Sequence, residues 1–395
     1  TCALPIWEAE YIFYMACAVV GKVNVPFPNV RPDWQKIYEI SAYHRIENIV
    51  AYAVEQLCLN KEYCEQIPDE VKKQFQKARL SGIMRETIQY HEYEKLTKLF
   101  EEEGIERMLL KGGLLKYEYP SQDMRFLTDL DILVKTKDLE RVSVLMEKLG
   151  YRVLHKGGHH DVYQKEPCMT VEIHKDCGTG YETLDNYMEG VWERSTKKEG
   201  CQTEYQMSWE DFYLYQTGHM AKHFEHGGAG IRMLLDFLVF ENTKMSCCNT
   251  KIVENQLTQA KLFTMEKKIR ELLQKGKCGE SLEKEPVWNY IVQSGTYGLF
   301  QFHLQTEVNR YENKKAYFLQ RIFPNQEQLI VAYPWLAQYP RRIWMAWIHR
   351  LTKKVICSPG KIIGEFRTLR NQDQNKKIRA CMKEMGLEEK SEHEN

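Results

Sequence analysis

The stretch MLLKGGLLKYEYPSQDMRFLTDLDILV, at residues 108–134, says more about the fold than any other part of the chain. It predicts a strand, a glycine turn, a short helix, a loop, and a second strand that carries Asp129 and Asp131. Successive side chains of a strand alternate between its faces, so both aspartates share one face and Leu130 and Ile132 share the other. Two carboxylates held this close repel each other unless a cation neutralises them. The spacing suits Mg²⁺ (or Mn²⁺), because Mg²⁺ takes a few carboxylates and keeps positions for phosphate oxygens.

The turn at Lys111, Gly112 and Gly113 predicts the other half of a nucleotide site. Glycine lets the backbone approach a phosphate closely, and a helix start just after it offers free N–H donors. We expect the two glycines to cradle phosphate, with Lys111 as a point charge and Arg125 as a two-pronged donor that neutralise it. The plainer alternative is a simple chain reversal with two surface cations.

A third acid follows in the segment MTVEIH at residues 169–174, which alternates as a strand. Glu172 and His174 share one face of it. If this strand lies beside the one with Asp129 and Asp131, three carboxylates converge, as two-metal phosphoryl or nucleotidyl transfer requires. We therefore take the three acids as candidate catalytic residues and metal ligands, and His174 as a nucleotide-binding candidate. The alternative for Glu172 is the solvated face of a sheet.

This block resembles the polymerase-β-like nucleotidyltransferase superfamily, whose pattern is a hydrophobic residue, Gly-Gly or Gly-Ser, D-x-D, and a third acid on a later strand. Within it, the chain is similar to an uncharacterised bacterial nucleotidyltransferase family. The similar segments are L-K-G at 110–112, Y-P at 119–120, Arg125, D-L-D-I-L-V at 129–134, G-Y at 150–151, V-E-I-H at 171–174, H-M-A-K-H at 219–223, R-M-L-L-D at 232–236, R-I-F-P at 321–324 and A-Y-P at 332–334. The resemblance touches roughly residues 35–355, and its specific part is 108–174.

The resemblance implies transfer of a nucleoside monophosphate from an NTP to an acceptor, with release of pyrophosphate. Asp129 and Asp131 would bind Mg²⁺ with the triphosphate, and Glu172 would complete a second metal site and help to deprotonate an acceptor hydroxyl. It also implies that His219 and His223 face the active-site cleft and contact the nucleotide or acceptor. A zinc site or a buried structural role remain alternatives for these histidines. The gap from Gly113 to Asp129 is longer than in the best-known polymerase-like members, so we expect the loop at 119–128 to shape the nucleotide pocket differently.

Composition narrows the class of protein. The chain has 395 residues, enough for two or three domains, and a formal net charge of zero, so it has no global basic field for nucleic acid. It has no run of eighteen apolar residues and no basic region near its start, so we expect neither a membrane span nor a signal peptide. Its twelve cysteines form no C-x₂-C pair, which is typical of reduced thiols in the cytoplasm. Whether residues 1–6 are native stays open.

We expect an α/β (α+β) nucleotidyltransferase core with a small mixed sheet at 104–205. An N-terminal helical region at 1–103, a C-terminal helical region at 206–385 and a disordered tail at 386–395 would flank it. The expected helices are Trp34–Tyr52, Pro68–Glu103, 138–149, 209–225, 229–243, 252–275, 284–305 and 310–321, and the expected strands are 105–110, 151–155, 160–165 and 169–174. We interpret His159, His160 and Asp161 as a hairpin tip.

Two rival functions remain open. One is a nucleotide-binding module that kept the fold and lost its chemistry. The other is an RNA- or membrane-associated protein that acts through the basic segment at 340–383, where Trp344 and Trp347 lie at helical spacing. The sequence names neither the base nor the acceptor, which could be a sugar phosphate, an antibiotic-like molecule, a tRNA or a protein. It is also silent on the pathway and the oligomeric state.

Overall fold

The structure is a computed structural model that describes residues 6–296, 298, 319–330, 332–357 and 372–387. Its α-helices are α1 (Ile6–Val20), α2 (Trp34–Tyr43), α3 (Glu47–Leu57), α4 (Lys61–Gln66), α5 (Asp69–Glu102), α6 (Lys111–Leu115), α7 (Leu139–Lys148), α8 (Glu182–Met188), α9 (Val191–Arg194), α10 (Trp209–Glu225), α11 (Ile231–Thr243), α12 (Thr250–Gln259), α13 (Phe263–Cys278), α14 (Pro286–Ser294), α17 (Gln326–Ile330), α18 (Ile343–Cys357) and α20 (Gln372–Glu384). Short 3₁₀ turns are η1 (Lys116–Glu118), η2 (Gln122–Met124), η3 (Thr136–Asp138), η4 (Met245–Cys247), η5 (Pro334–Ala337) and η6 (Pro340–Arg342). The strands are β1 (Arg107–Leu109), β2 (Leu130–Val134), β3 (Arg152–His155), β4 (His160–Lys165), β5 (Met169–His174), β6 (Thr196–Lys197) and β7 (Glu204–Gln206).

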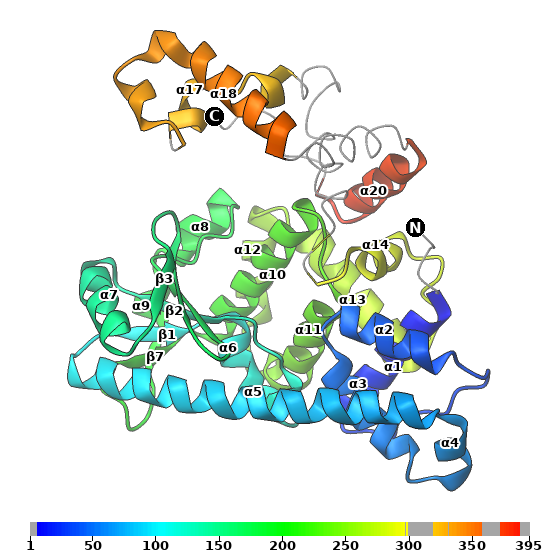
Figure 1. Cartoon of the computed structure of the whole chain (residues 1–395). Helices are drawn as coiled ribbons and strands as arrows, with labels where there is room; N and C mark the ends of the chain where they lie inside the picture. Colours follow the sequence, from blue (N-terminus) through cyan, green and yellow to red (C-terminus); the bar gives the residue numbers. More distant parts are fainter. Residues whose placement is uncertain (1–5, 297, 299–318, 331, 358–371, 388–395) are drawn as a thin grey trace.

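The described strands form one mixed sheet in the order β3-β4-β5-β2-β1-β7-β6. Strand β2 runs parallel to β5, and the register places Asp131 opposite Glu172. The expected adjacency of the two acidic strands is therefore confirmed, and so is the α/β fold class with flanking helices (Figure 1). Strands β6 and β7 were not predicted, because two or three residues are too few to show a period-two pattern.

The two faces of the sheet have different environments. One face packs on α7 and on the C-terminal half of α5, where Leu96 and Phe100 meet Ile132 and other apolar side chains of β2 and β5. Asp131 and the side chains that alternate with this apolar set point to the other face. The apolar stripe thus anchors the acidic strands, and the opposite face is free to build a site.

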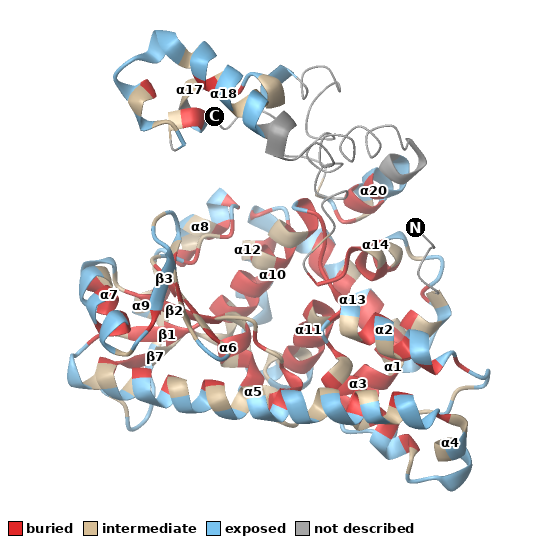
Figure 2. Ribbon diagram, in the orientation of Figure 1, coloured by how far each residue is buried: buried red, intermediate tan, exposed pale blue. Residues whose placement is uncertain are grey.

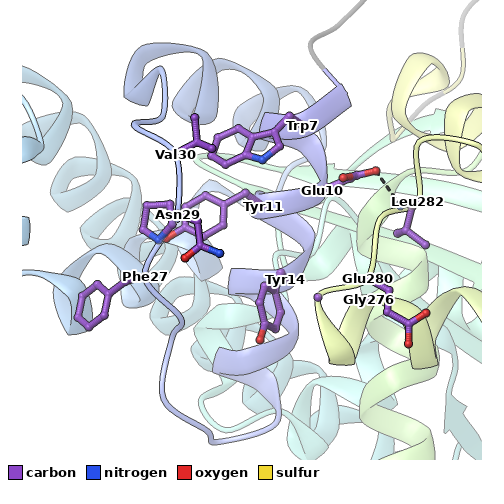
Figure 3. A pocket seen from close by; sticks show the side chains of 12 residues that line it. Trp7, Glu10, Tyr11, Tyr14, Phe27, Asn29, Val30, Gly276, Glu280 and Leu282 are labelled. Carbon is purple, nitrogen blue, oxygen red and sulfur yellow. Dashed lines mark hydrogen bonds between the residues drawn. The ribbon is translucent and has the colours of Figure 1, made fainter.

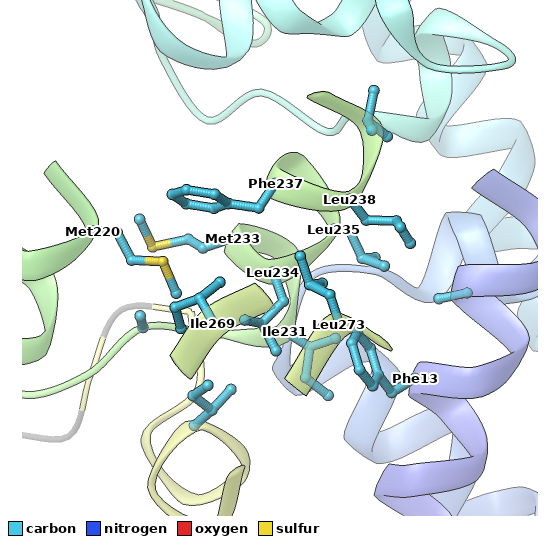
Figure 4. Packing of buried hydrophobic residues seen from close by; sticks show 14 of the residues in the cluster. Phe13, Met220, Ile231, Met233, Leu234, Leu235, Phe237, Leu238, Ile269 and Leu273 are labelled. Carbon is cyan, nitrogen blue, oxygen red and sulfur yellow. The ribbon is translucent and has the colours of Figure 1, made fainter. Parts of the chain in front are cut away.

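The helical regions at the two ends of the sequence share one hydrophobic core. Figure 4 shows Phe13 of α1 beside Leu273 of α13, with Ile231 and Leu234 of α11 in the same cluster. Gly276 permits this contact, because any Cβ there would overlap the Phe13 ring. The N-terminal helices and the C-terminal helices α10 to α14 therefore form one packed body, whereas α17 and α18 have a small hydrophobic cluster of their own; the predicted boundaries at 103 and 205 remain predictions.

Helix α5 connects the helical core to the sheet and runs along one side of both (Figures 1 and 2). Its Phe75 lies in the helical core, and its Phe100 lies under the sheet. Between them, Gln89 donates from Nε2 to the carbonyl of Leu127 at 3.2 Å, next to the acidic strand. One long amphipathic helix, predicted at 68–103, thus sets the position of the acidic strand relative to the helical body.

Two predicted helices are each split in the structure. The segment Trp34–Tyr52 forms α2 and α3, with a break at Arg45 (φ +57°), and the segment 252–275 forms α12 and α13, with a break at Lys261 (φ +59°). A residue in the left-handed conformation ends a helix whatever its side chain is. When that residue is not glycine, the spacing of apolar residues does not reveal the break. The helix expected at 284–305 begins as α14, Pro286–Ser294, and residues 299–305 lie outside the described residues. The segment 310–321 lies almost wholly outside them as well.

Among the described residues, no helix is long and apolar enough to cross a membrane. The described cysteines are free thiols. The basic segment at 340–383 is described only in part, as η6, α18 and α20.

Candidate functional site

A cavity of about 410 Å³ lies between the acidic face of the sheet and helices α10 and α11. The predicted site residues come to it from several parts of the chain. Those that line it are Lys111, Gly112, Arg125, Asp129, Asp131, Glu172, His174, His219 and His223. Gly113 is the one predicted site residue that does not line the cavity.

Three carboxylates stand at the floor of this cavity. Asp131 is buried on β2, Glu172 is its register partner on β5, and Asp129 comes one residue before β2 begins. The pKa of Asp129 is raised to about 6, first by burial and then by the negative charges of Asp131 and Glu172. A bound cation would relieve the part of this shift that comes from the neighbouring carboxylates.

Two nitrogen-bearing side chains meet one oxygen of Asp131. The Nζ of Lys111 donates to Asp131 Oδ1 at 2.6 Å, and His174 Nε2 lies 2.7 Å from the same oxygen. Burial alone would raise the pKa of Asp131, but these two partners hold it below its ordinary value. Burial would lower the pKa of Lys111, yet the Asp131 carboxylate raises it. Neither contact uses Oδ2 of Asp131, so that oxygen is available to a further cation.

Backbone conformation aims Lys111 at the acids. It is the first residue of α6 and has φ +47°, a left-handed conformation that costs a non-glycine residue about 1 kcal/mol. Such a cost is tolerated where the side chain makes compensating contacts, here with buried Asp131.

The glycine pair has a different role from the one expected. Both glycines lie inside α6 and not in a turn. A Cβ on Gly112 would stand 2.8 Å from the guanidinium carbon of Arg125, and a Cβ on Gly113 would stand 3.0 Å from Leu130 Cδ1. The N–H of Gly113 already donates to the Leu110 carbonyl at 3.0 Å. The phosphate contact expected at Gly113 therefore has no support from its position and stays a prediction, and the glycines let α6 pack closely against its neighbours.

Arg125 is paired with an acid that we did not predict. Its Nε and Nη2 donate to the two carboxylate oxygens of Asp236 at 2.7 and 2.8 Å, and Tyr119 donates to the same carboxylate at 2.7 Å. The pair is buried, so the guanidinium ties the loop at 119–128 to α11. This geometry gives no support to a phosphate contact through those two donors. Arg232, four residues before Asp236 on α11, lines the cavity and is a cation that we overlooked within R-M-L-L-D.

The two helical histidines lie one turn apart on α10, with ring centroids 4.5 Å from each other. Burial lowers the pKa of both, and that of His223 falls to about 4. Both are therefore neutral near pH 7 and offer hydrogen bonds rather than positive charge. Within the described residues, no third His, Cys, Asp or Glu completes a metal-binding group with them.

His160 lies at the tip of the β3–β4 hairpin, as expected, and it also lines the cavity, which we did not predict. It is the first residue of β4 and pairs with His174 in the antiparallel register between β4 and β5. Its Nε2 lies 3.7 Å from Glu172 Oε2, and its ring centroid lies 5.0 Å from that of His174. The sequence could have predicted this contact, because His160 is the first residue of β4 and His174 is the last residue of β5, so an antiparallel pairing brings them together.

A second, smaller cavity of about 160 Å³ lies between α1 and the segment after α13 (Figure 3). Trp7, Tyr11 and Tyr14 line it, and the Glu10 carboxylate at its edge accepts a hydrogen bond from the Leu282 N–H at 2.7 Å. No predicted site residue reaches it. We therefore keep the candidate site at the acidic cavity.

An acidic strand pair, a third carboxylate in register and a cationic helix start, all on a mixed sheet, define the nucleotidyltransferase class. More particularly, residues 31–275 match the family of uncharacterised nucleotidyltransferases, and this chain belongs to that family. Membership supports a transferase role with an NTP as substrate. Neither a curated protein nor a solved structure matches the chain.

Proposed function

We propose that this protein is a metal-dependent nucleotidyltransferase that moves a nucleoside monophosphate from an NTP to an acceptor hydroxyl. A bond forms between the acceptor oxygen and the α-phosphorus, the α–β phosphoanhydride bond breaks, and pyrophosphate leaves. The observation that carries this proposal is the set of three carboxylates, Asp129, Asp131 and Glu172, brought from two adjacent strands to one cavity.

The carboxylates fit divalent cations. Burial and then the negative charges of Asp131 and Glu172 raise the pKa of Asp129, and Asp131 already attracts the ammonium group of Lys111. Asp129, Asp131 and Glu172 would hold the cations, which when bound stabilise the attacking and leaving oxygens of the transferred group. The oxygen-only set of Asp129 and Asp131 suits Mg²⁺ with its phosphate ligands.

Other side chains of the cavity take the remaining tasks. Lys111 neutralises the terminal phosphates once it leaves Asp131, and Arg232 supplies a second cation from α11. Glu172 accepts the proton of the acceptor hydroxyl. His219 and His223 bind the base or the acceptor as neutral donors and acceptors. Arg125 acts indirectly, because its pairing with Asp236 holds the loop that leads into Asp129.

The test is transfer activity in matched variants. Each labelled NTP is incubated with the protein, Mg²⁺ and a cell extract, and the labelled product is identified. Asp129→Asn, Asp131→Asn and Glu172→Gln should abolish labelling while circular dichroism shows an intact fold. The control is Glu166→Gln, which makes the same change at an exposed carboxylate of the β4–β5 hairpin. Near-normal labelling with either aspartate replaced would refute the proposal.

A second candidate function, contact with an anionic membrane surface, has one observation in its favour. On α18, Trp344 and Ile348 are each 54% exposed, and Arg341 and Arg342 flank them. An exposed Trp beside basic residues suits a lipid headgroup layer. Trp347 points elsewhere and donates from Nε1 to the Pro324 carbonyl at 2.9 Å.

Vesicle sedimentation tests this second candidate. Binding to phosphatidylserine vesicles that Trp344→Ser weakens, with no binding to neutral phosphatidylcholine, would support it. No binding to either kind of vesicle would refute it. Binding of the protein to RNA, in a parallel assay, without binding to phosphatidylserine vesicles would also refute it.

A further inference from the structure

Beside the aspartates, three side chains of a different chemistry meet around one point. They are His160 of β4, and Glu172 and His174 of β5. One ligand atom of each lies within 4.8 Å of the others. The β4–β5 ladder holds them, because the register pairs His160 with His174 and places Glu172 opposite Val162, two residues along on the same face as His174.

The separations suit a metal with only a small adjustment. His174 Nε2 lies 3.4 Å from Glu172 Oε2, and His160 Nε2 lies 3.7 Å from the same oxygen. Nitrogen and oxygen ligands bound at about 2.1 Å around a tetrahedral centre stand about 3.4 Å apart. Three protein ligands of this kind leave a fourth position open to water or substrate, as in catalytic rather than structural sites.

The charges around this point also favour a dication. Asp129, Asp131 and Glu172 bring three carboxylates to the cavity, and Lys111 supplies an ammonium group to offset them. Asp131 lies on the inner side of the histidine pair, with its Oδ1 2.7 Å from His174 Nε2. A cation held by the histidines would therefore have a carboxylate as its next neighbour.

We propose that the cation position beside Glu172 is a transition-metal site, with His160, Glu172 and His174 as its protein ligands. Imidazole nitrogen suits Mn²⁺, Co²⁺ and Zn²⁺, whereas Mg²⁺ takes oxygen ligands almost exclusively. The site therefore selects a different cation from the oxygen-only position at Asp129 and Asp131. This inference rests on the proposed function, since Glu172 is shared by both.

Co²⁺ reports this site directly, because its d–d absorption depends on nitrogen ligation and geometry. The full chain without nucleotide is titrated with Co²⁺ in the presence of a hundredfold excess of Mg²⁺. We expect one equivalent of Co²⁺ to give visible absorption bands that Mg²⁺ does not remove and that Zn²⁺ does.

The ligand assignment is tested with matched histidine variants. His160→Asn, which changes a half-exposed residue, should weaken Co²⁺ binding by at least tenfold. His155→Asn, which makes the same change on the exposed strand β3, should leave it unaltered. Circular dichroism and thermal melting of both variants verify the fold, and His174→Asn provides a second test of the ligand set.

The outcomes separate this inference from the proposed function. Absence of the bands, displacement by Mg²⁺, or equal binding by the His160 and His155 variants would overturn the transition-metal site. NTP transfer with Mg²⁺ alone could survive that result. Co²⁺ binding that depends on His160, in a protein without transferase activity, would support the site and overturn the proposed function.

Discussion

At the scale of single residues, Lys111 has both a strained backbone conformation and a direct contact with the charged Asp131. Its side chain is 18% exposed, and its ammonium group contacts the Asp131 carboxylate. A cation bound to Asp131 would compete with this ammonium group for the carboxylate. Lys111 therefore serves as the counter-ion of Asp131 until a ligand and a cation bind. Replacing Lys111 by alanine tests whether the ammonium group also binds phosphate or only neutralises Asp131.

Lys111→Ala should weaken NTP binding by roughly ten- to a hundredfold, since a charge-assisted contact contributes about 1.5–3 kcal/mol. The loss should be larger for NTP than for NMP, because the ammonium group is proposed to face the terminal phosphates. Calorimetry with Mg²⁺ measures both affinities, and Lys148→Ala, on the exposed face of α7, is the control. Equal losses for NTP and NMP would remove Lys111 from the terminal phosphates.

At the scale of elements, the site depends on how tightly α6 and the loop at 119–128 are held. The glycines of α6 bring it against Arg125 and β2, and Arg125 binds Asp236 of α11. The glycine contacts are buried, and the Arg125–Asp236 pair is both buried and polar. Breaking them should cost stability as well as activity.

Gly112→Ala should destabilise the protein by about 1–3 kcal/mol, because its Cβ would stand 2.8 Å from both the Arg125 guanidinium and Leu127 Cδ2. Gly82→Ala is the matched control inside α5. Its Cβ would meet Asn48 Cβ at 3.4 Å, and alanine favours a helix over glycine. Urea unfolding measures the stability of both variants. Equal stability of the two would show that the neighbours of α6 move to make room for the added methyl group.

Asp236→Asn should destabilise the fold by about 3–5 kcal/mol, since it leaves the buried Arg125 guanidinium without its counter-charge. Glu65→Gln removes one partner of the exposed pair between Lys61 and Glu65 and should change stability by less than about 0.5 kcal/mol. Thermal melting of both variants gives the comparison. A small effect at Asp236 would indicate that water reaches Arg125 on loss of its partner.

At the scale of the whole molecule, His44 joins the N-terminal helices to the C-terminal ones. It is fully buried at the end of α2. Its Nε2 lies 3.2 Å from the Val292 carbonyl of α14, and its Nδ1 lies 3.2 Å from the Ile231 N–H of α11. Both contacts require neutral imidazole, with Nε2 as donor and Nδ1 as acceptor. Burial lowers its pKa from the ordinary 6.5 to about 4.

The sign of the pH effect follows from this pKa. Between about pH 6.5 and pH 4 the unfolded chain binds a proton at this histidine and the folded chain does not, so stability falls as the pH falls through that window. His44→Gln should make the slope of unfolding free energy against pH shallower by up to one proton per molecule. The exposed variant His155→Gln should leave the slope unchanged. Urea unfolding between pH 5 and 7 measures it, and an unaltered slope in the His44 variant would contradict the linkage.

Local sequence patterns predicted the acidic strands, strands β3, β4 and β5, and helices α5, α7, α10 and α11, whereas the nucleotidyltransferase class came from the resemblance of motifs in residues 108–174 to a known family. Alternation and helical periodicity are local properties, and each of these segments is long enough to display them. The carboxylates Asp129, Asp131 and Glu172 could be singled out for the same reason.

Only the tertiary structure decided which groups meet. It paired Arg125 with Asp236, turned the glycines of α6 to packing, and brought His160 to Glu172. The first contact joins residues 111 positions apart, the second joins a helix to the loop and strand that follow it, and the third depends on the register between β4 and β5. Such contacts are set by the packing of the whole core, and the order of residues along one segment does not encode them.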